Sequence, residues 1–205
     1  MNTSETLRPK AASTDLRGGE TSLNLPNSIT VLRILLIPVF VWLYLDHTPE
    51  GALWAGLVFA TAAFTDFLDG YLARRSGQIT NLGKLLDPVA DKLLVAAGLI
   101  LLVHAQQVAV WLAIVMIARE LIVTGARAVA ANEGFIVPAD SLGKCKVVGQ
   151  IGGILCLIFQ SVWLEAQTLL SSIGIILLYM ALFLSLVSGW RYLTLIFKKI
   201  SPQYW

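Results

Sequence analysis

The sequence predicts an all-α integral membrane protein with six transmembrane helices and both termini in the cytoplasm. Composition is the first observation behind this prediction: of 205 residues, 57% are hydrophobic and 14% are charged, whereas soluble domains carry about 25% charged residues. The second is a set of six apolar runs, because a helix needs about 20 mostly apolar residues to cross a bilayer. The runs cover residues 29 to 45, 51 to 65, 93 to 103, 108 to 118, 147 to 164 and 168 to 190.

The distribution of basic residues predicts how the six helices are oriented. Lys and Arg crowd the cytoplasmic ends of membrane helices. With both termini cytoplasmic, all 15 Lys and Arg fall on the cytoplasmic side, whereas five or seven helices would place basic clusters outside. We therefore expect a multi-pass protein of the cytoplasmic membrane. The opposite face would carry Asp46, His47, Glu50, His104 and Glu165.

The chain is expected to be one membrane domain, residues 23 to 197, between two tails. Residues 1 to 22 are polar and lack the apolar segment of a signal peptide, so we expect a disordered cytoplasmic tail. Pro26 and Asn27 favour a helix start. Residues 198 to 205 are basic and aromatic, and Lys198 and Lys199 are expected to contact lipid headgroups.

Several apolar runs reach the length of a span only if their helices continue through charged neighbours. The residues placed inside helices in this way are Asp66 and Asp69, Asp87 and Asp91, and Arg119 and Glu120. Intramembrane carboxylates and arginines are costly, and they usually face a polar cavity or a functional site. The helix ends that carry these charges therefore hold the candidate functional residues.

Four aspartates form two pairs that a short turn, residues 76 to 83, brings together. Asp66 and Asp69 are three residues apart and Asp87 and Asp91 are four apart, so each pair shares one face of its helix. Four carboxylates in a small site repel one another unless cations balance them. Aspartate oxygens suit Mg²⁺ or Mn²⁺, and two such ions favour displacement at phosphorus. The pattern predicts a two-metal site.

The residues that follow Asp69 fit a phosphate-bearing substrate. Gly70 and Ala73 keep one strip of the helix open, and Arg74 can bind a phosphate through two hydrogen bonds. The alternative is that the aspartates only form interfacial salt bridges with nearby basic residues. Those residues are Arg74, Arg75, Lys84 and Lys92.

Residues 65 to 92, "TDFLDGYLARRSGQITNLGKLLDPVADK", carry the spacing Asp-x2-Asp-Gly-x2-Ala-Arg-x8-Gly-x3-Asp-x3-Asp. This resembles the signature of the CDP-alcohol phosphotransferases. The resemblance implies a six-helix membrane fold, usually a homodimer, with a dinuclear metal site that opens to the cytoplasm. It implies metal ligation by Asp66, Asp69, Asp87 and Asp91, with Asp91 also the base for the acceptor hydroxyl. It implies binding of the CDP-linked donor by Asp66, Asp69, Gly70, Ala73, Arg74, Gln78 and Thr80.

Basic residues elsewhere predict an acceptor that carries a phosphate. Within the family, the flanking segments "IARELIVTGARAVAA" and "SLGKCKVVGQ" are most similar to members that use CDP-diacylglycerol and glycerol 3-phosphate; Val147 replaces a frequent threonine. The expected acceptor site consists of Thr30, Arg33, Arg119, Arg127, Lys144 and Lys146. The alternative is that Arg119 and Arg127 pair with Glu120 and that the two lysines only follow the positive-inside rule.

Three alternative functions stay open at this point. The acceptor could instead be inositol phosphate, serine or phosphatidylglycerol, although a neutral acceptor would not need so many basic residues. A membrane prenyltransferase also binds a diphosphate through aspartates, but Gly70, Ala73 and Arg74 favour the nucleotide family. A divalent-cation transporter could use intramembrane carboxylates, but no acidic residue stands midway along the other runs.

Overall fold

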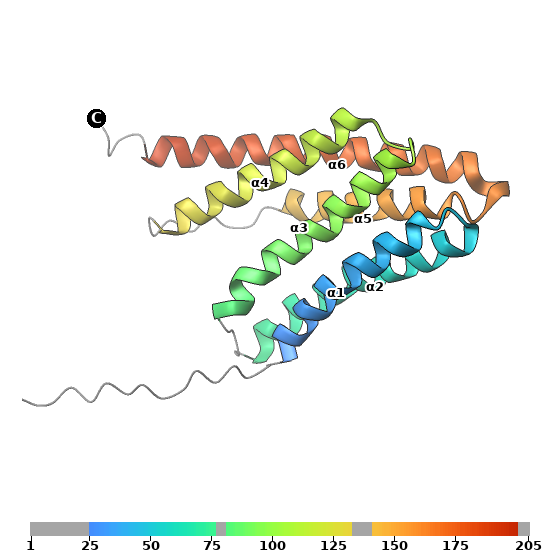
Figure 1. Cartoon of the computed structure of the whole chain (residues 1–205). Coiled ribbons are helices and arrows are strands. Elements are labelled where there is room, and N and C mark those ends of the chain that lie inside the picture. The colour runs from blue at the N-terminus through green and yellow to red at the C-terminus, as the bar shows by residue number, and fades with distance from the viewer. Residues whose placement is uncertain (1–24, 77–80, 133–140, 201–205) are drawn as a thin grey trace, which may run out of the picture.

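The computed structural model is all-helical over the residues that it describes, which are 25–76, 81–132 and 141–200, with side chains described over 30–65, 89–131 and 145–195 (Figure 1). The predicted all-α class is therefore confirmed. The elements are α1 (Leu25–Leu45), α2 (Pro49–Ser76), α3 (Asn81–His104), α4 (Val110–Asn132), α5 (Ser141–Phe159), the short 3-10 helix η1 (Leu164–Ala166) and α6 (Gln167–Ile200). The predicted tails lie mainly outside these residues.

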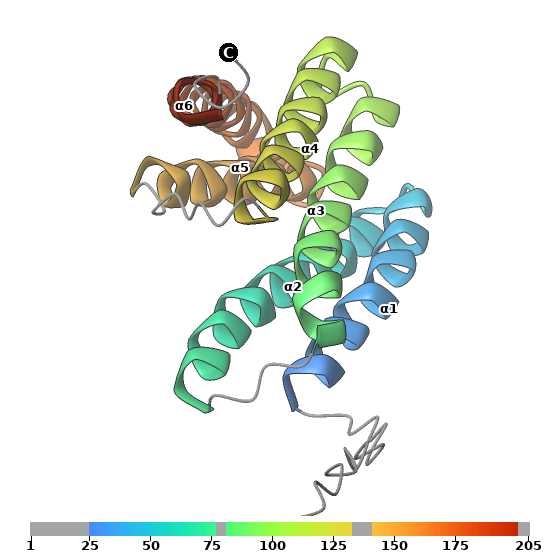
Figure 2. The ribbon, with the colours of Figure 1, turned by 90° about the vertical axis from the view of Figure 1, so that its left-hand side faces the viewer.

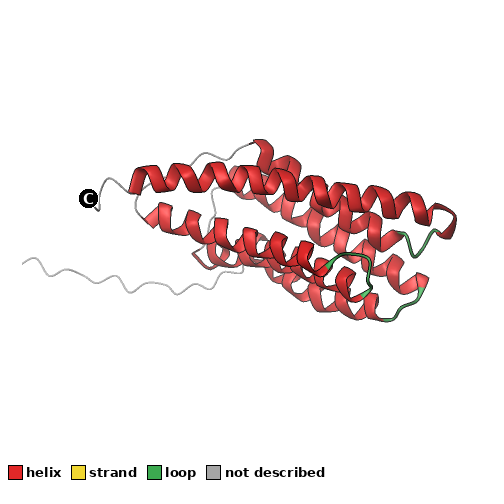
Figure 3. Ribbon diagram, turned by 90° about the horizontal axis from the view of Figure 1, so that it is seen from above, coloured by secondary structure: helices red, strands yellow, loops and turns green. Residues whose placement is uncertain are grey.

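Successive long helices run in opposite directions, so the start of α1 and the end of α6 lie at the same end of the bundle (Figures 1 and 3). The opposite end holds the turns α1–α2, α3–α4 and α5–α6. The five ionisable residues expected on one face lie in or beside these turns: Asp46, His47, Glu50, His104 and Glu165. The rings of His47 and His104 are 5.9 Å apart between centroids. The five residues expected on one face of the membrane thus lie at one end of the bundle.

One described stretch, Leu164–Leu195, is long and apolar enough by itself to cross a membrane, with a mean hydropathy of 2.4. The stretches Thr30–Leu45 and Cys145–Phe159 are apolar but shorter over the described residues. The other long helices include the charged positions that the sequence places inside them. Their crossing of a bilayer therefore stays a prediction.

Local chemistry explains the sharp turn between α1 and α2. Pro49 is the first residue of α2, where its missing N–H costs no helical hydrogen bond. Thr48 Oγ1 accepts a hydrogen bond from the Gly51 backbone N–H at 2.9 Å and so caps the helix start. The same hydroxyl donates to Asp46 Oδ2 at 2.7 Å. His47 adopts a φ of 55°, which reverses the chain direction.

Helix α3 connects the two parts of the bundle (Figure 2). It packs against α1 and α2 on one side and against α4 and α5 on the other, while α6 packs against α4 and α5. The buried core follows these contacts. Its largest side chains include Phe40, Phe59, Leu99, Leu102, Leu112, Ile154, Leu157 and Leu178. Because α3 contacts both parts, its polar residues lie where several helices meet.

Two glycines allow α5 and α6 to approach closely. A Cβ on Gly153 would lie 3.0 Å from the Gly174 carbonyl oxygen, and a Cβ on Gly174 would lie 3.0 Å from the Gly153 carbonyl oxygen. Small residues serve this purpose at helix interfaces in membranes. The close crossing fixes the start of α5 relative to α4 and α6, and with it Lys146.

We expect Gly174→Val to lower the midpoint of thermal unfolding in detergent by several degrees, because overpacking costs about 1–3 kcal/mol. A Cβ at residue 174 would lie 2.7 Å from Leu157 Cγ and 3.0 Å from the Gly153 carbonyl oxygen. Gly125→Val is the matched control, since a Cβ at Gly125 meets nothing within 4 Å. Equal midpoints of thermal unfolding for Gly174→Val and Gly125→Val would contradict the close crossing of α5 and α6 at Gly174.

Candidate functional site

The aspartate pairs lie on α2 and α3 as expected. Asp66 and Asp69 belong to the second half of α2, and Asp87 and Asp91 belong to the first half of α3. The helical spacing of each pair, three and four residues, is therefore present in the backbone. Asp91 is the member whose side chain is described. Its carboxylate Oδ2 lies 3.9 Å from Lys92 Nζ.

Most of the expected donor-binding residues lie outside the described part of the chain. Gln78 and Thr80 fall in the segment 77–80, and the side chains of Asp66, Asp69, Asp87 and Arg74 fall outside the described ranges. Gly70 and Ala73 are described only as part of helix α2. The metal site and the donor site therefore stay predictions from the sequence.

A pocket of about 290 Å³ lies between α3, α4 and α5. Over the described residues, α4 and α5 each pack against α3 and α6 but not against each other, which leaves this space between them. Most of its wall is apolar. Its polar lining residues are Asp91 and Lys92 from α3, Glu120 and Thr124 from α4, and Gln150 from α5.

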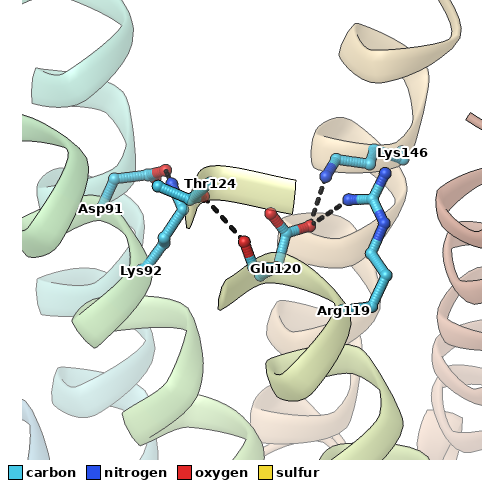
Figure 4. Close-up of polar contacts among 6 residues, drawn as sticks. All are labelled: Asp91, Lys92, Arg119, Glu120, Thr124 and Lys146. Atoms are coloured by element: carbon cyan, nitrogen blue, oxygen red, sulfur yellow. Dashed lines mark hydrogen bonds and ion pairs between the residues drawn. The ribbon is translucent and has the colours of Figure 1, made fainter. Parts of the chain in front are cut away.

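Two cations converge on one carboxylate oxygen beside the pocket (Figure 4). Arg119 Nη1 donates to Glu120 Oε1 at 2.9 Å, and Lys146 Nζ donates to the same oxygen. Thr124 Oγ1 donates to the Glu120 backbone carbonyl at 2.7 Å. The pair between Glu120 and Lys146 bridges α4 and α5. We call Arg119, Glu120 and Lys146 the charged triad.

The charged triad is largely removed from solvent and carries one net positive charge. The exposed fractions of Arg119 and Lys146 are 8% and 9%. Buried charges are tolerated when they are paired and hydrogen-bonded. Glu120 lies between the Asp91–Lys92 pair and the two cations, as Figure 4 shows.

Arg119 retains an unused hydrogen-bond donor. Its Nε atom is buried and has no hydrogen-bond partner. The guanidinium fits against α6 because residue 189 is glycine: a Cβ there would lie 3.1 Å from Arg119 Nε. Buried charged donors without an acceptor are rare in native structures. This donor therefore lies beside α6, and Arg119 does not itself line the pocket.

The other residues expected at the acceptor site have separate surroundings. Thr30 and Arg33 are each 1% exposed on α1, and Arg33 Nε donates to the Ala62 carbonyl of α2 at 3.2 Å. The Arg127 guanidinium lies 5.2 Å from the centre of the Tyr192 ring. The side chain of Lys144 lies outside the described residues.

The structure therefore brings Arg119 and Lys146 together on Glu120, which lines the pocket although neither cation does, whereas Arg33 and Arg127 contact other residues. The alternative in which Arg119 and Arg127 pair with Glu120 is confirmed for Arg119, whereas Arg127 lies over the Tyr192 ring. Lys146 also pairs with Glu120, whereas the alternative reading of the sequence places Lys146 at the membrane surface. Gln150 is a further polar residue of the site. Its spacing of four residues from Lys146 is the signal that could have found it.

Comparison with known proteins supports the family resemblance that the aspartate motif indicates. Residues 23–187 match the sequence model of the family described as CDP-alcohol phosphatidyltransferase. The chain is 40% identical over 181 residues to a CDP-diacylglycerol–glycerol-3-phosphate 3-phosphatidyltransferase of Bacillus subtilis, covering 82% of this chain and 93% of the relative. Proteins with the same name from Rickettsia bellii and Shigella flexneri are 36% and 38% identical. Those two matches cover 82% and 83% of this chain and 93% of each relative.

Proposed function

This chain belongs to the CDP-alcohol phosphatidyltransferase family, and we propose that it transfers the phosphatidyl group of CDP-diacylglycerol to glycerol 3-phosphate. The products are phosphatidylglycerophosphate and CMP, so the protein acts in phospholipid biosynthesis. The names of the relatives support both substrates. The convergence of Arg119 and Lys146 on Glu120, which lines the same pocket as Asp91, is the structural observation that carries the choice of acceptor.

A phosphate-bearing acceptor fits the charged triad because its dianion needs basic partners separate from the donor site. Arg119 supplies a buried Nε donor without a partner, and Lys146 supplies a second buried cation. Hydrogen bonds between such cations and phosphate are among the strong ones in proteins. Serine or phosphatidylglycerol would bring no phosphate monoester to these two residues. Thr30, Arg33, Arg127 and Lys144 would add positive charge or hydrogen-bond donors farther from the acceptor phosphate.

The predicted metal ligands also suit the family chemistry. Asp66, Asp69, Asp87 and Asp91 belong to helices α2 and α3, which pack together, and four carboxylates form an all-oxygen donor set that suits Mg²⁺ or Mn²⁺. These four residues would hold two divalent ions. When bound, the ions would offset the negative charge of the donor diphosphate.

In the proposed reaction, the acceptor hydroxyl oxygen attacks the β-phosphorus of CDP-diacylglycerol. A new phosphorus–oxygen bond forms, the bond from that phosphorus to the CMP oxygen breaks, and CMP departs with the bond electrons. Asp91 takes the proton of the attacking hydroxyl. Arg119 and Lys146 hold the acceptor phosphate, which orients the hydroxyl toward the donor.

The donor is bound by residues around the signature. Asp66, Asp69, Gly70, Ala73 and Arg74 on α2 contact its cytidine diphosphate portion, assisted by Gln78 and Thr80. The apolar part of the pocket wall, which includes Val89 and Leu93, keeps bulk water from competing with the alcohol as the nucleophile.

The proposed setting is the cytoplasmic membrane, crossed by all six long helices, with the aspartate end facing the cytoplasm and two chains forming a homodimer. Three observations favour this setting and orientation. The start of α1 and the end of α6 share one end of the bundle (Figure 3). The basic residues of the sequence concentrate toward the same end, and the family implies a lipid substrate.

Acceptor identity is tested by CMP release from purified protein with Mg²⁺ and CDP-diacylglycerol. Glycerol 3-phosphate, inositol phosphate, serine and phosphatidylglycerol are supplied separately, each with a matched reaction in excess EDTA. We expect release with glycerol 3-phosphate that EDTA abolishes. Release with serine or phosphatidylglycerol alone would discard the proposed acceptor, and cation uptake into proteoliposomes without CMP release would favour a transporter.

A further inference from the structure

Gln150 is a buried polar residue whose amide donor is unused. It is 5% exposed on α5, and its Nε2 atom has no hydrogen-bond partner. Leaving a buried amide donor unpaired costs free energy, so native structures rarely contain one without a reason. Its apolar neighbours in the pocket wall, such as Ile117 and Val147, offer no oxygen. A molecule bound in the pocket would supply the missing acceptor.

The position of Gln150 relates it to both ends of the proposed acceptor site. It follows Lys146 by four residues on α5, so the two side chains share one face of the helix about 6 Å apart along its axis. It also lines the same pocket as Asp91 and Glu120. A small molecule in the pocket that contacts both Asp91 and Glu120, the member of the charged triad that lines it, shares the pocket with Gln150.

Glycerol 3-phosphate has three polar groups, and the proposed function uses two of them. Its primary hydroxyl is the nucleophile beside Asp91, and its phosphate binds Arg119 and Lys146. The secondary hydroxyl on the middle carbon has no partner in that scheme. We infer that Gln150 donates a hydrogen bond from Nε2 to this secondary hydroxyl and thereby selects acceptors with a glycerol backbone. This inference rests on the proposed function.

Selection follows from the cost of the unpaired amide. An acceptor that lacks the middle hydroxyl leaves Nε2 buried without an oxygen, and a site built to bind a hydroxyl rejects analogues without one. A neutral hydrogen bond of this kind corresponds to a roughly three- to tenfold difference in kcat/KM. Removing the amide should abolish the difference without changing the charges that hold the phosphate.

The test compares glycerol 3-phosphate with 3-hydroxypropyl phosphate, which keeps the primary hydroxyl and the phosphate but lacks the secondary hydroxyl. CMP release by the full-length protein gives kcat/KM for each acceptor. We expect wild type to favour glycerol 3-phosphate by roughly three- to tenfold and Gln150→Met to bring the ratio close to one. Because both acceptors are measured on the same preparation, loss of folded protein cancels in the ratio.

Gln160→Met is the matched control. Gln160 is also buried, at 6% exposed, but it lies at the far end of α5 and does not line the pocket. We expect this variant to keep the wild-type ratio. A wild-type ratio in Gln150→Met, or equal use of both acceptors by wild type, would overturn the inference alone. No CMP release by wild type with either acceptor would overturn the proposed function as well.

Discussion

Asp91→Asn is expected to lower the rate of CMP release at least a hundredfold. The side chain lines the pocket between α3, α4 and α5, and the proposal makes it both a metal ligand and the base for the acceptor hydroxyl. A positioned general base contributes about 10²- to 10⁴-fold to a rate. Asparagine has nearly the same size, but it cannot take up the proton and it ligates cations weakly.

The control for Asp91→Asn is Asp46→Asn, the same chemical change at the opposite end of the bundle. Asp46 lies in the α1–α2 turn, where it accepts a hydrogen bond from Thr48. Both variants are purified in detergent, and their thermal midpoints and steady-state rates are compared. A rate above one tenth of wild type in Asp91→Asn would argue against Asp91 as base and ligand.

Arg119→Gln and Lys146→Met are each expected to raise the KM for glycerol 3-phosphate by roughly a hundredfold, with a much smaller change in the KM for CDP-diacylglycerol. Both cations are at least nine-tenths buried beside the pocket. Removing one partner of a buried charge pair costs about 2–5 kcal/mol, and 1.4 kcal/mol corresponds to a factor of ten. Each single variant leaves Glu120 paired with the other cation, so the fold should persist.

Arg191→Gln provides the comparison for the charged triad. Arg191 is an exposed arginine of α6, whereas Arg119 and Lys146 are buried. Steady-state kinetics with each substrate varied in turn separate the two KM values. Equal increases in both KM values, or an unchanged KM for glycerol 3-phosphate, would show that Arg119 and Lys146 do not bind the acceptor phosphate.

The helices of this fold are predictable because their signals are local. Apolar runs and the spacing of charges determine where helices continue, and α2 and α3 do extend through the aspartate positions. The grouping of His47, His104 and Glu165 at one end follows from the same alternation of directions. The close crossing of α5 and α6 is not predictable in this way, since many of the 16 glycines would suit such a contact.

The charged triad is harder to predict because it joins residues that are far apart in the chain. Glu120 and Lys146 are 26 positions apart, and they meet because α4 and α5 both pack against α3 and α6. Sequence reasoning identifies both cations and the pair between Arg119 and Glu120, but it cannot choose among several possible partners. Arg127 illustrates the difficulty. The sequence allows it to pair with Glu120, but its guanidinium lies over the Tyr192 ring of α6.

Gln150 shows a second limit of sequence reasoning. A glutamine within an apolar run is compatible with a structural hydrogen bond, with exposure at a helix end or with ligand binding. Only burial together with an unpaired Nε2 atom distinguishes these cases. That distinction requires the positions of the neighbouring helices.

The proposed reaction joins a phosphatidyl group to glycerol 3-phosphate. It is tested by mass spectrometry of the lipid formed when purified protein is incubated with Mg²⁺, CDP-diacylglycerol and isotopically labelled glycerol 3-phosphate. We expect phosphatidylglycerophosphate that carries the label, together with an equal amount of CMP. CMP formed without labelled lipid, or no conversion of CDP-diacylglycerol, would contradict it.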